Sequence, residues 1–143
     1  MAKVTVKLPD DLLKKLSSLG SKTDQIARKA LEAGGEVILK KTKANLISVI
    51  GKDVKYESRS TGQLISALGL SPVKVDKNGN YNIKLGFDEY RRDGTSNAAI
   101  ANIIEYGKHG QPAKPFLTPA KRQSNKEVNE TMKRVIEEEI KKL

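Results

Sequence analysis

Strict alternation of apolar and polar residues occurs in two parts of the chain and predicts β-structure in both. Near the N-terminus, residues 4–8 (VTVKL) place two valines and a leucine around threonine and lysine, which is typical of a half-buried strand. A second alternating stretch covers about residues 71–87 and is interrupted by Asn78-Gly79. An Asn-Gly pair readily takes the positive φ angles of a tight turn, so this stretch predicts a β-hairpin.

Apolar residues at helical spacing follow the first predicted strand and indicate two helices. The shorter helix has Asp10 or Asp11 as its expected N-cap. The longer helix is expected to begin at Thr23 or Asp24 and to run to about Ile50.

Two adjacent glycines, Gly34 and Gly35, lie in the middle of the long predicted helix. Each glycine costs roughly 1 kcal/mol in a helix interior relative to alanine. We therefore expect either a kink at this point or a neighbouring element packed very close to the helix.

Three more helical segments are predicted in the second half of the chain. Residues 60–70 indicate a short helix or turn, and residues 98–107 a short helix that Gly107 ends. Thr118-Pro119 predicts the start of the last helix, with a capping residue followed by proline in the first turn. An apolar stripe then continues towards the C-terminus.

The order of these elements predicts a single α+β domain over residues 1–143. A small antiparallel sheet, which includes the hairpin, would be packed by one long helix and two to three shorter helices. A polar loop is expected at 88–97.

The 143 residues suffice for one core, and no apolar run is long enough to span a membrane. The chain has no cysteine, which is typical of folding in a reducing cytoplasm.

The net charge of +10 is concentrated in the first part of the chain, where residues 1–59 carry 13 basic and 7 acidic side chains. Lys40, Lys41 and Lys43 form the densest basic cluster. Such a surface permits contact with nucleic acid or with an acidic protein, and it also occurs on ordinary solvated helices. Charge by itself selects none of these.

Residues suited to catalysis are few. The single histidine, His109, lies in a glycine-flanked stretch without an evident orienting acid, and no cysteine is present. One histidine cannot supply the usual ligand set of a transition-metal site, and the sequence DKNGN lacks the spacing of a calcium loop. We therefore expect neither an enzyme nor a cofactor or metal site.

Residues 3–34 resemble the ribbon-helix-helix DNA-binding fold, in which a strand pairs with its twin in a dimer and enters the major groove. The outward residues of the strand would be Lys3, Thr5 and Lys7. Strand, Pro-Asp and amphipathic helix also describe an ordinary entry into an α+β domain, and the second helix is long for this fold. A DNA-binding regulator is therefore the alternative hypothesis.

Residues 103–120 (IIEYGKHGQPAKPFLTPA) hold three of the five prolines, one of the two phenylalanines and the only histidine. Pro115 fixes its own φ and favours an extended backbone at Lys114, so Phe116 is presented with little conformational freedom. The segment is expected to be a stiff connector. Phe116 could fill the core of its own chain or contribute to an interface, and Glu105 could cap or pair locally.

This segment is similar to the signature of the tail-completion, or head–tail joining, proteins of long-tailed bacteriophages. The matching residues are Ile104, Glu105, Tyr106, Gly107, Ala113, Pro115, Phe116, Leu117, Pro119 and Ala120. That family also commonly has a short strand and helix, a long helix, and a hairpin that ends in Gly-Phe, here Gly86-Phe87. Lys108 and Lys114 stand where the family often has threonine and arginine, and a lysine cannot supply a planar guanidinium.

The resemblance implies a non-enzymatic component of the virion neck, made in the host bacterial cytoplasm and not associated with a membrane. It implies a homo-oligomeric ring, with six subunits, around the DNA channel, between head-connector and tail-terminator ring proteins. The implied interface residues are Glu105, Tyr106, Gly107, Lys114, Pro115, Phe116 and Pro119. Replacing Glu105 by alanine is accordingly expected to weaken ring contacts and to leave the fold intact.

Several lysines would have a use in such a ring, either in non-specific contact with passing double-stranded DNA or against an acidic partner. These candidate contacts are Lys40, Lys41, Lys43, Lys74, Lys77 and Lys84. An ordinary solvated surface remains the alternative for each of them.

Overall fold

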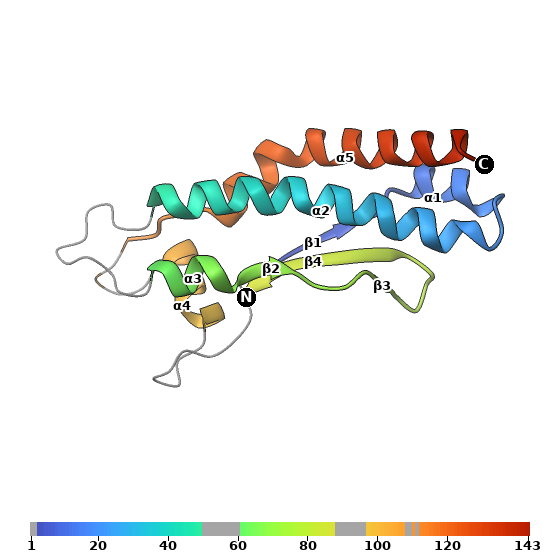
Figure 1. The fold of residues 1–143 in the computed structure, drawn as a ribbon. Helices are drawn as coiled ribbons and strands as arrows, with labels where there is room; N and C mark the ends of the chain where they lie inside the picture. The colour runs from blue at the N-terminus through green and yellow to red at the C-terminus, as the bar shows by residue number, and fades with distance from the viewer. Residues whose placement is uncertain (1–2, 50–60, 88–96, 108–109, 111) are drawn as a thin grey trace.

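One long helix lies along a small antiparallel sheet, and a second long helix lies beside the first (Figure 1). The computed structural model describes residues 3–49, 61–87, 97–107, 110 and 112–143. In chain order the elements are β1 (Val4–Lys7), α1 (Asp10–Ser17), α2 (Lys22–Val49), α3 (Thr61–Ala67), β2 (Leu68–Leu70), β3 (Lys74–Val75), β4 (Tyr81–Phe87), α4 (Asn97–Tyr106) and α5 (Leu117–Lys141). The α+β fold expected from the sequence is confirmed.

Two features noted in the sequence lie wholly or mostly outside the residues that the structure describes. The polar loop expected at 88–97 lies outside the described ranges except for Asn97, which opens α4. His109 also lies outside them. Within those ranges, no helix is long and apolar enough to cross a lipid bilayer.

β4 is the central strand of the sheet. β1 pairs with one side of β4, and β2 and β3 pair in succession with the other side, all of them antiparallel. The predicted hairpin between β3 and β4 is confirmed. Its turn is closed by the Asp76 carboxylate, which accepts hydrogen bonds from the backbone amides of Asn78 and Asn80 at 2.9 Å each. Gly79 takes the positive φ of 80° that favours glycine in this turn.

β2 was not predicted from the sequence, which indicated a helix or turn over all of residues 60–70. The helix α3 ends at Ala67, and the next three residues are extended and pair with the end of β4, with Leu68 opposite Phe87. Tertiary pairing with a distant strand therefore decides the conformation of a segment too short to show its own periodicity.

A β-bulge separates β2 from β3. Leu70 lies opposite Leu85 and Lys74 lies opposite Asn82, so four steps along one arm match three steps along β4. Ser71 bridges the irregular part, because its amide donates to the carbonyl of Lys84 at 2.7 Å and its hydroxyl accepts from the amide of Lys84 at 3.0 Å.

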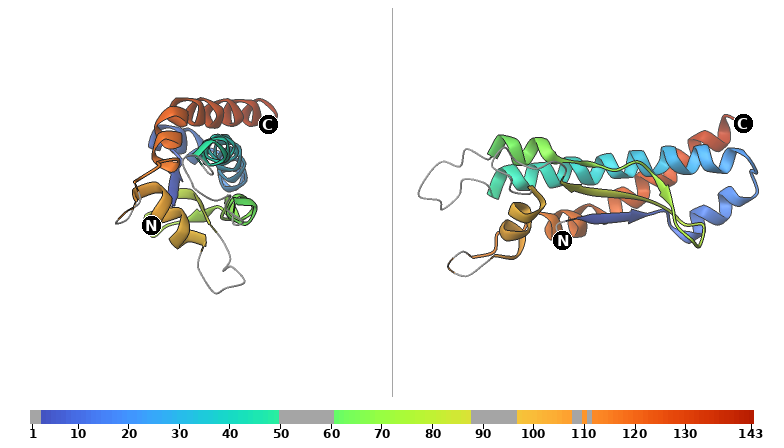
Figure 2. Two further views of the ribbon diagram at one scale, coloured as in Figure 1. Left: turned by 90° about the vertical axis from the view of Figure 1, so that its left-hand side faces the viewer. Right: turned by 90° about the horizontal axis from the view of Figure 1, so that it is seen from below.

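The sheet has one apolar face, which packs against α2. Val4 and Val6 of β1 lie opposite Leu85 and Ile83 of β4, and all four side chains are buried. The alternating residues of the same strands, among them Lys7 and the exposed Lys84, lie on the other face. Among the described residues, no helix lies along the outer face of β1 and β4 (Figure 2).

α2 runs unbroken through both of its glycines, and each glycine contacts a different neighbour. A Cβ at Gly34 would lie 2.8 Å from Cγ of Met132 in α5. A Cβ at Gly35 would lie 3.1 Å from Cδ1 of Leu70 in β2. Of the two expected explanations, close packing is the one that the structure provides, because these glycines let α2 approach both the helix and the sheet.

α5 lies against α2 through an apolar seam. Val128, Met132 and Ile136, which follow one another at helical spacing, are buried. At the periphery of the seam, Lys29 of α2 donates to the Glu139 carboxylate at 2.6 Å. The apolar stripe expected in the last helix is therefore its contact with the long helix.

The predicted N-caps of the first two helices are wrong. α1 begins at Asp10 itself, follows Pro9, and has no side-chain cap. α2 begins at Lys22, so Thr23 and Asp24 lie within its first turn. The Thr23 hydroxyl instead donates to the backbone carbonyl of Leu16 and joins the two helices.

Candidate functional site

The candidate site begins at the C-terminal end of α4, where the conspicuous segment starts. The helix ends as predicted at Gly107, which has a φ of 77° and whose amide donates to the carbonyl of Ile103 at 2.7 Å. Two residues earlier, Glu105 points into the protein and is only 2% exposed. A buried carboxylate requires hydrogen-bond donors, and these identify what it does.

Glu105 caps the start of α5 from outside that helix. Its Oε2 accepts hydrogen bonds from the amides of Phe116 at 2.7 Å and Leu117 at 2.9 Å, and its Oε1 accepts from the amide of Thr118 at 2.9 Å. These amides belong to the N-terminal turn, where no intrahelical partner is present and where the helix dipole favours a negative charge. The N-cap residue, Phe116, has no capping side chain of its own.

This arrangement differs from the predicted helix start. Thr118 was expected to be the cap, with Pro119 in the first turn, but the helix begins at Leu117 and Thr118 lies inside it. Pro119 still falls within the first turn, where a missing amide hydrogen costs nothing. The sequence analysis expected the fold to tolerate replacement of Glu105 by alanine. Because Glu105 caps α5, we now expect this replacement to destabilise the fold.

The backbone between the two helices is attached at further points. The amide of Lys114 donates to the carbonyl of Ile104 at 2.7 Å, so the chain returns alongside the end of α4. From α2, the side-chain amide of Asn45 donates to the carbonyl of Phe116 at 3.3 Å. Together with the carboxylate cap, these contacts hold residues 114–118 against two other helices.

Phe116 is a core residue. Its side chain is fully buried, and its ring meets that of Phe87 edge to face, with 6.0 Å between the ring centroids and an interplanar angle of 76°. Of the two roles left open for Phe116, the structure provides the core role within the chain. Glu105 and Phe116, both implied to be interface residues, therefore present no side-chain surface in the folded subunit.

The charge state of Glu105 follows from its donors. Burial raises the pKa of the Glu105 carboxyl, but hydrogen bonds from the Thr118 side chain and from the amides of residues 116–118 outweigh burial and hold the pKa below its ordinary value. The carboxylate is therefore ionised at neutral pH, as a helix N-terminus favours.

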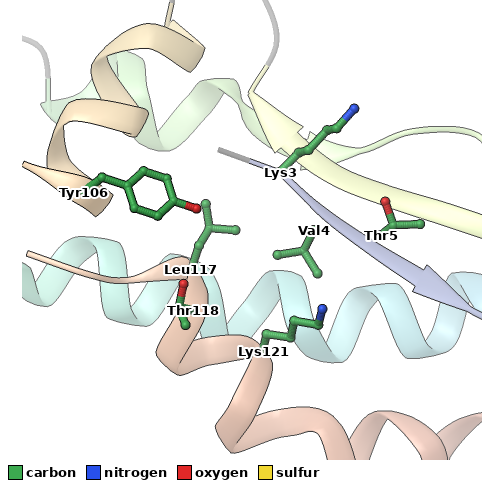
Figure 3. Close-up of a pocket in the computed structure, with 7 residues that line it drawn as sticks. All are labelled: Lys3, Val4, Thr5, Tyr106, Leu117, Thr118 and Lys121. Carbon is green, nitrogen blue, oxygen red and sulfur yellow. The ribbon is translucent and has the colours of Figure 1, made fainter. Parts of the chain in front are cut away.

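The exposed part of the segment lies next to this buried anchor. Tyr106 is 62% exposed, Pro115 is exposed, and Lys114 is half-buried. Beside Tyr106 there is a pocket of about 470 Å³ lined by residues of β1, α4 and α5. Figure 3 shows the Tyr106 ring over Leu117 and Thr118, with Lys3 and Lys121 on the β1 side.

The candidate lysines do not form one surface. Lys74, Lys77 and Lys84 belong to the hairpin and are exposed, and Lys84 lies on the outer face of the sheet. The cluster at residues 40–43 lies on α2, which covers the inner face, with Lys43 half-buried. The sheet therefore separates the two groups.

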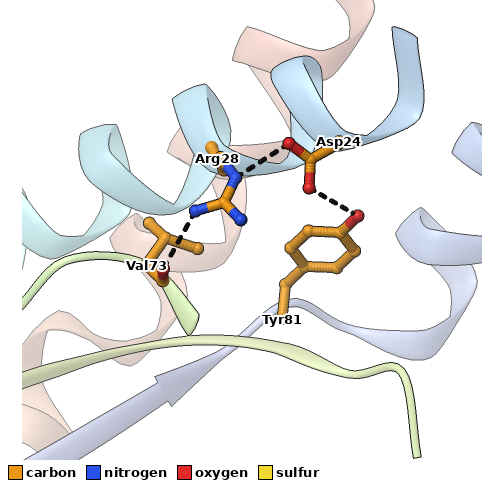
Figure 4. A network of polar contacts seen from close by, with 4 residues as sticks. All are labelled: Asp24, Arg28, Val73 and Tyr81. Atoms are coloured by element: carbon orange, nitrogen blue, oxygen red, sulfur yellow. Dashed lines mark hydrogen bonds and ion pairs between the residues drawn. The ribbon is translucent and has the colours of Figure 1, made fainter. Parts of the chain in front are cut away.

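A second polar network, missed by the sequence reasoning, ties α2 to the sheet (Figure 4). Arg28 donates through Nε to Asp24 at 2.8 Å and through Nη1 to the carbonyl of Val73 at 3.0 Å. The Tyr81 hydroxyl donates to the other oxygen of Asp24 at 3.1 Å. The hydrogen bond from Arg28 holds the pKa of Asp24 below its usual value. The spacing of Asp24 and Arg28 suggests a helix pair, but nothing local indicates the contact with the bulge.

The described residues contain no group of three or more histidine, cysteine or acidic side chains placed to hold a metal ion. Their most deeply buried carboxylate, Glu105, is fully occupied as a helix cap.

Comparison with protein families matches residues 10–107 to the family described as "Bacteriophage HK97-gp10, putative tail-component". The match covers more than half of the chain, and the chain belongs to this family. It extends from the first residue of α1 to the glycine that ends α4, so β1 and α5 lie outside it. No curated protein and no solved structure matches the chain. Membership of a family of phage tail components implies a place in the virion and contacts with other virion proteins.

Proposed function

We propose that the protein is a tail-completion, or head–tail joining, component that forms a ring around the DNA channel in the virion neck. In this role it acts through protein–protein contacts and not through catalysis. The observation that carries the proposal is the anchoring of residues 114–118 by the buried Glu105 carboxylate. The exposed Tyr106 follows Glu105 in the chain, and the exposed Pro115 precedes Phe116.

A closed ring repeats one interface at every subunit. In a closed ring every subunit presents the same surface to its neighbour, so a surface whose shape varies costs conformational entropy at each interface. Pro115 limits the backbone on one side of Phe116, the carboxylate holds the amides that follow, and the ring of Phe116 is fixed in the core. A subunit built in this way loses little freedom when it docks.

In the proposed ring, Tyr106 and Pro115 contact neighbouring subunits or the adjacent head-connector and tail-terminator rings, and Gly107, Lys114 and Pro119 shape the backbone around them. Six subunits are the expected number, from the resemblance to the tail-completion family. Lysines that face the channel would meet double-stranded DNA without reading its sequence. Lysines on outer faces would meet acidic partners.

The alternative of a ribbon-helix-helix regulator gains no support from any particular contact. In that fold the first strand pairs with its twin, whereas here β1 pairs with β4 of its own chain. Its second helix is short, whereas α2 has 28 residues. We therefore propose no second function.

The test is electron microscopy of lysates from a producer strain that lacks this gene. Filled heads beside unattached tails are expected, and a plasmid copy of the gene should restore joined particles. Intact infectious particles in the deletion strain would contradict a role in joining. Tails of abnormal length would point to a different tail position, and would overturn the placement in the neck.

A point variant tests the surface separately. Tyr106→Ala removes an exposed ring and should leave the melting temperature unchanged while lowering the yield of joined particles. Leu143→Ala is the matched control, because Leu143 is 56% exposed and follows the C-terminal end of α5, the end opposite the segment. Equal yields for the two variants would exclude Tyr106 from the interface.

A further inference from the structure

The strand β1 has one unpaired edge. In antiparallel pairing, alternate residues exchange hydrogen bonds with the partner strand, and the residues between them direct their amides and carbonyls the other way. The amide of Leu8 donates to the carbonyl of Tyr81 at 3.1 Å, which assigns the even-numbered residues of β1 to the bonded set. The backbone groups of Thr5 and Lys7 therefore point to the open edge.

No backbone or side-chain group among the described residues pairs with these open-edge groups of Thr5 and Lys7. The opposite edge of the sheet is different. There the bulge, Pro72 and two very short strands interrupt the ladder, and such features normally prevent further pairing. β1 is regular over four residues and carries none of them.

A groove follows the open edge of β1. The 470 Å³ pocket beside Tyr106 and a smaller pocket of about 90 Å³ share Val4, Thr5 and Lys121, so together they run from the end of α4 along the strand. The smaller pocket is bounded by apolar residues of β1, α2 and α5 and by polar side chains of α5. These are Val4, Val6, Ile38, Val128, Asn125 and Asn129.

The groove is basic. Lys3 lines the larger pocket, Lys7 lines the smaller one and Lys121 lines both. In Figure 3 Lys121 extends from α5 towards the strand, and the Lys3 side chain is directed over the β4 side. None of the described residues that line either pocket is an aspartate or glutamate. Charge complementarity therefore selects an occupant that carries carboxylates.

We propose that the open edge of β1 binds an extended, acidic segment of another virion protein as an added strand of the sheet. Backbone hydrogen bonds to Thr5 and Lys7 provide the pairing, alternate side chains of the segment enter the groove, and its carboxylates meet Lys3, Lys7 and Lys121. The proposal rests on membership of the tail-component family and not on placement in the neck.

A polypeptide strand fits this edge better than DNA does. The edge offers carbonyl acceptors as well as amide donors, and only a peptide backbone supplies the complement of both. The phosphate backbone of DNA has no hydrogen-bond donor to pair with the carbonyls of Thr5 and Lys7. DNA binding through the lysines alone is therefore an outcome that the test must separate.

The first experiment blocks the edge without changing the fold. Thr5→Pro removes an amide hydrogen that points away from β4 and puts the proline ring in its place, which edge strands tolerate. Thr5→Val is the matched control, because it changes the side chain and keeps the amide. We expect Thr5→Pro to melt close to the wild type and to be incorporated into particles at least about tenfold less well, and Thr5→Val to be incorporated normally.

Hydrogen exchange gives a second measurement that does not depend on the proline variant folding. In the isolated wild-type protein the amides of Val6 and Leu8 should exchange slowly, and those of Thr5 and Lys7 quickly. In purified particles the amides of Thr5 and Lys7 should become protected. Fast exchange at both residues in the particle would overturn the proposal whatever the proline variant does.

Charge reversal tests the acidic character of the segment. The triple variant Lys3→Glu, Lys7→Glu and Lys121→Glu should lose incorporation by about tenfold or more. The triple variant Lys126→Glu, Lys133→Glu and Arg134→Glu changes the net charge equally on exposed positions of α5 and should be incorporated normally. Equal losses for both triple variants would indicate a net-charge or DNA effect and would overturn the proposed acidic segment. Joined particles without this protein would contradict the neck placement but would leave these outcomes unchanged.

Discussion

The two ends of α5 are attached to the rest of the molecule by different physical means. Its C-terminal half lies on α2 through an apolar seam in which Met132 fits over Gly34. Its first turn is held by a buried carboxylate on another helix. An apolar seam tolerates sliding and repacking, whereas three hydrogen bonds to one carboxylate fix both distance and direction. The fixed end is the one that carries the conspicuous surface segment.

The largest expected effect comes from removing the aromatic ring beneath the fixed end. Phe116→Ala deletes a fully buried ring and its edge-to-face contact with Phe87, and should lower the free energy of unfolding by about 3–5 kcal/mol. Chemical denaturation of the purified protein measures this loss. If stability were unchanged while particle assembly failed, Phe116 would belong to an interface.

In the seam between α2 and α5, substitutions at Gly34 and Met132 should have non-additive effects on the free energy of unfolding. Met132→Ala should cost about 2–4 kcal/mol, because it opens a cavity. Gly34→Ala should also destabilise, since the new Cβ would lie 2.8 Å from Met132 Cγ. The double variant should lose at least about 1 kcal/mol less than the two single losses combined, because the shorter residue 132 leaves room for the new methyl group. Strict additivity in denaturation would show that α5 does not press on Gly34.

At the fixed end of α5, the loss of stability should depend on how many carboxylate oxygens remain at position 105 to accept the backbone amides. Glu105→Ala leaves the buried amides of Phe116 and Leu117 without a partner and should cost about 2–4 kcal/mol. Glu105→Gln keeps one oxygen acceptor and should cost about half as much. Glu127→Ala, on the exposed side of the same helix, should stay within about 0.5 kcal/mol of the wild type. A Glu105→Ala protein as stable as this control would show that the cap contributes nothing.

The smallest expected effect is a pH dependence that belongs to Glu105. Its pKa is lower in the folded protein than its ordinary value of 4.5, so the unfolded chain binds more protons at mildly acidic pH. The stability contribution is fully present above pH 4.5 and is lost as the pH falls through the folded pKa. The stability gap between the wild type and Glu105→Gln should therefore shrink on acidification. A gap that stays constant with pH would mean that the charge of Glu105 has no role.

The difference between the two ends of α5 also explains what the sequence could predict. The seam repeats at helical spacing, so the stripe of Val128, Met132 and Ile136 is visible without a structure. The adjacent glycines of α2 indicated either a kink or a close approach, and the structure has the close approach. The alternation of apolar residues likewise predicted β1 and the hairpin, because each pattern is contained in a few neighbouring residues.

The cap was not predictable from a local pattern. Glu105 lies 11 to 13 residues before the amides that it binds, and nothing in the intervening residues requires the chain to return. One indirect signal was present: Pro119 limits the helix start to the preceding few residues, and Phe116 cannot cap it. The contact of Arg28 with Val73, 45 residues away, and the strand β2 escaped for the same reason. Each depends on a partner that only the tertiary fold brings close.

The central place of β4 has a consequence for how the chain is made. β1 is synthesised well before its partner, because β4 begins at Tyr81 and Val4 can pair only once Leu85 has been made. At about 5–20 residues per second, roughly 4–16 s pass on the ribosome before these residues can meet. During that interval both edges of the nascent N-terminal strand are open, and Lys3 and Lys7 flank its valines. The charges of these two lysines would then oppose premature β-pairing between nascent chains on the same polysome.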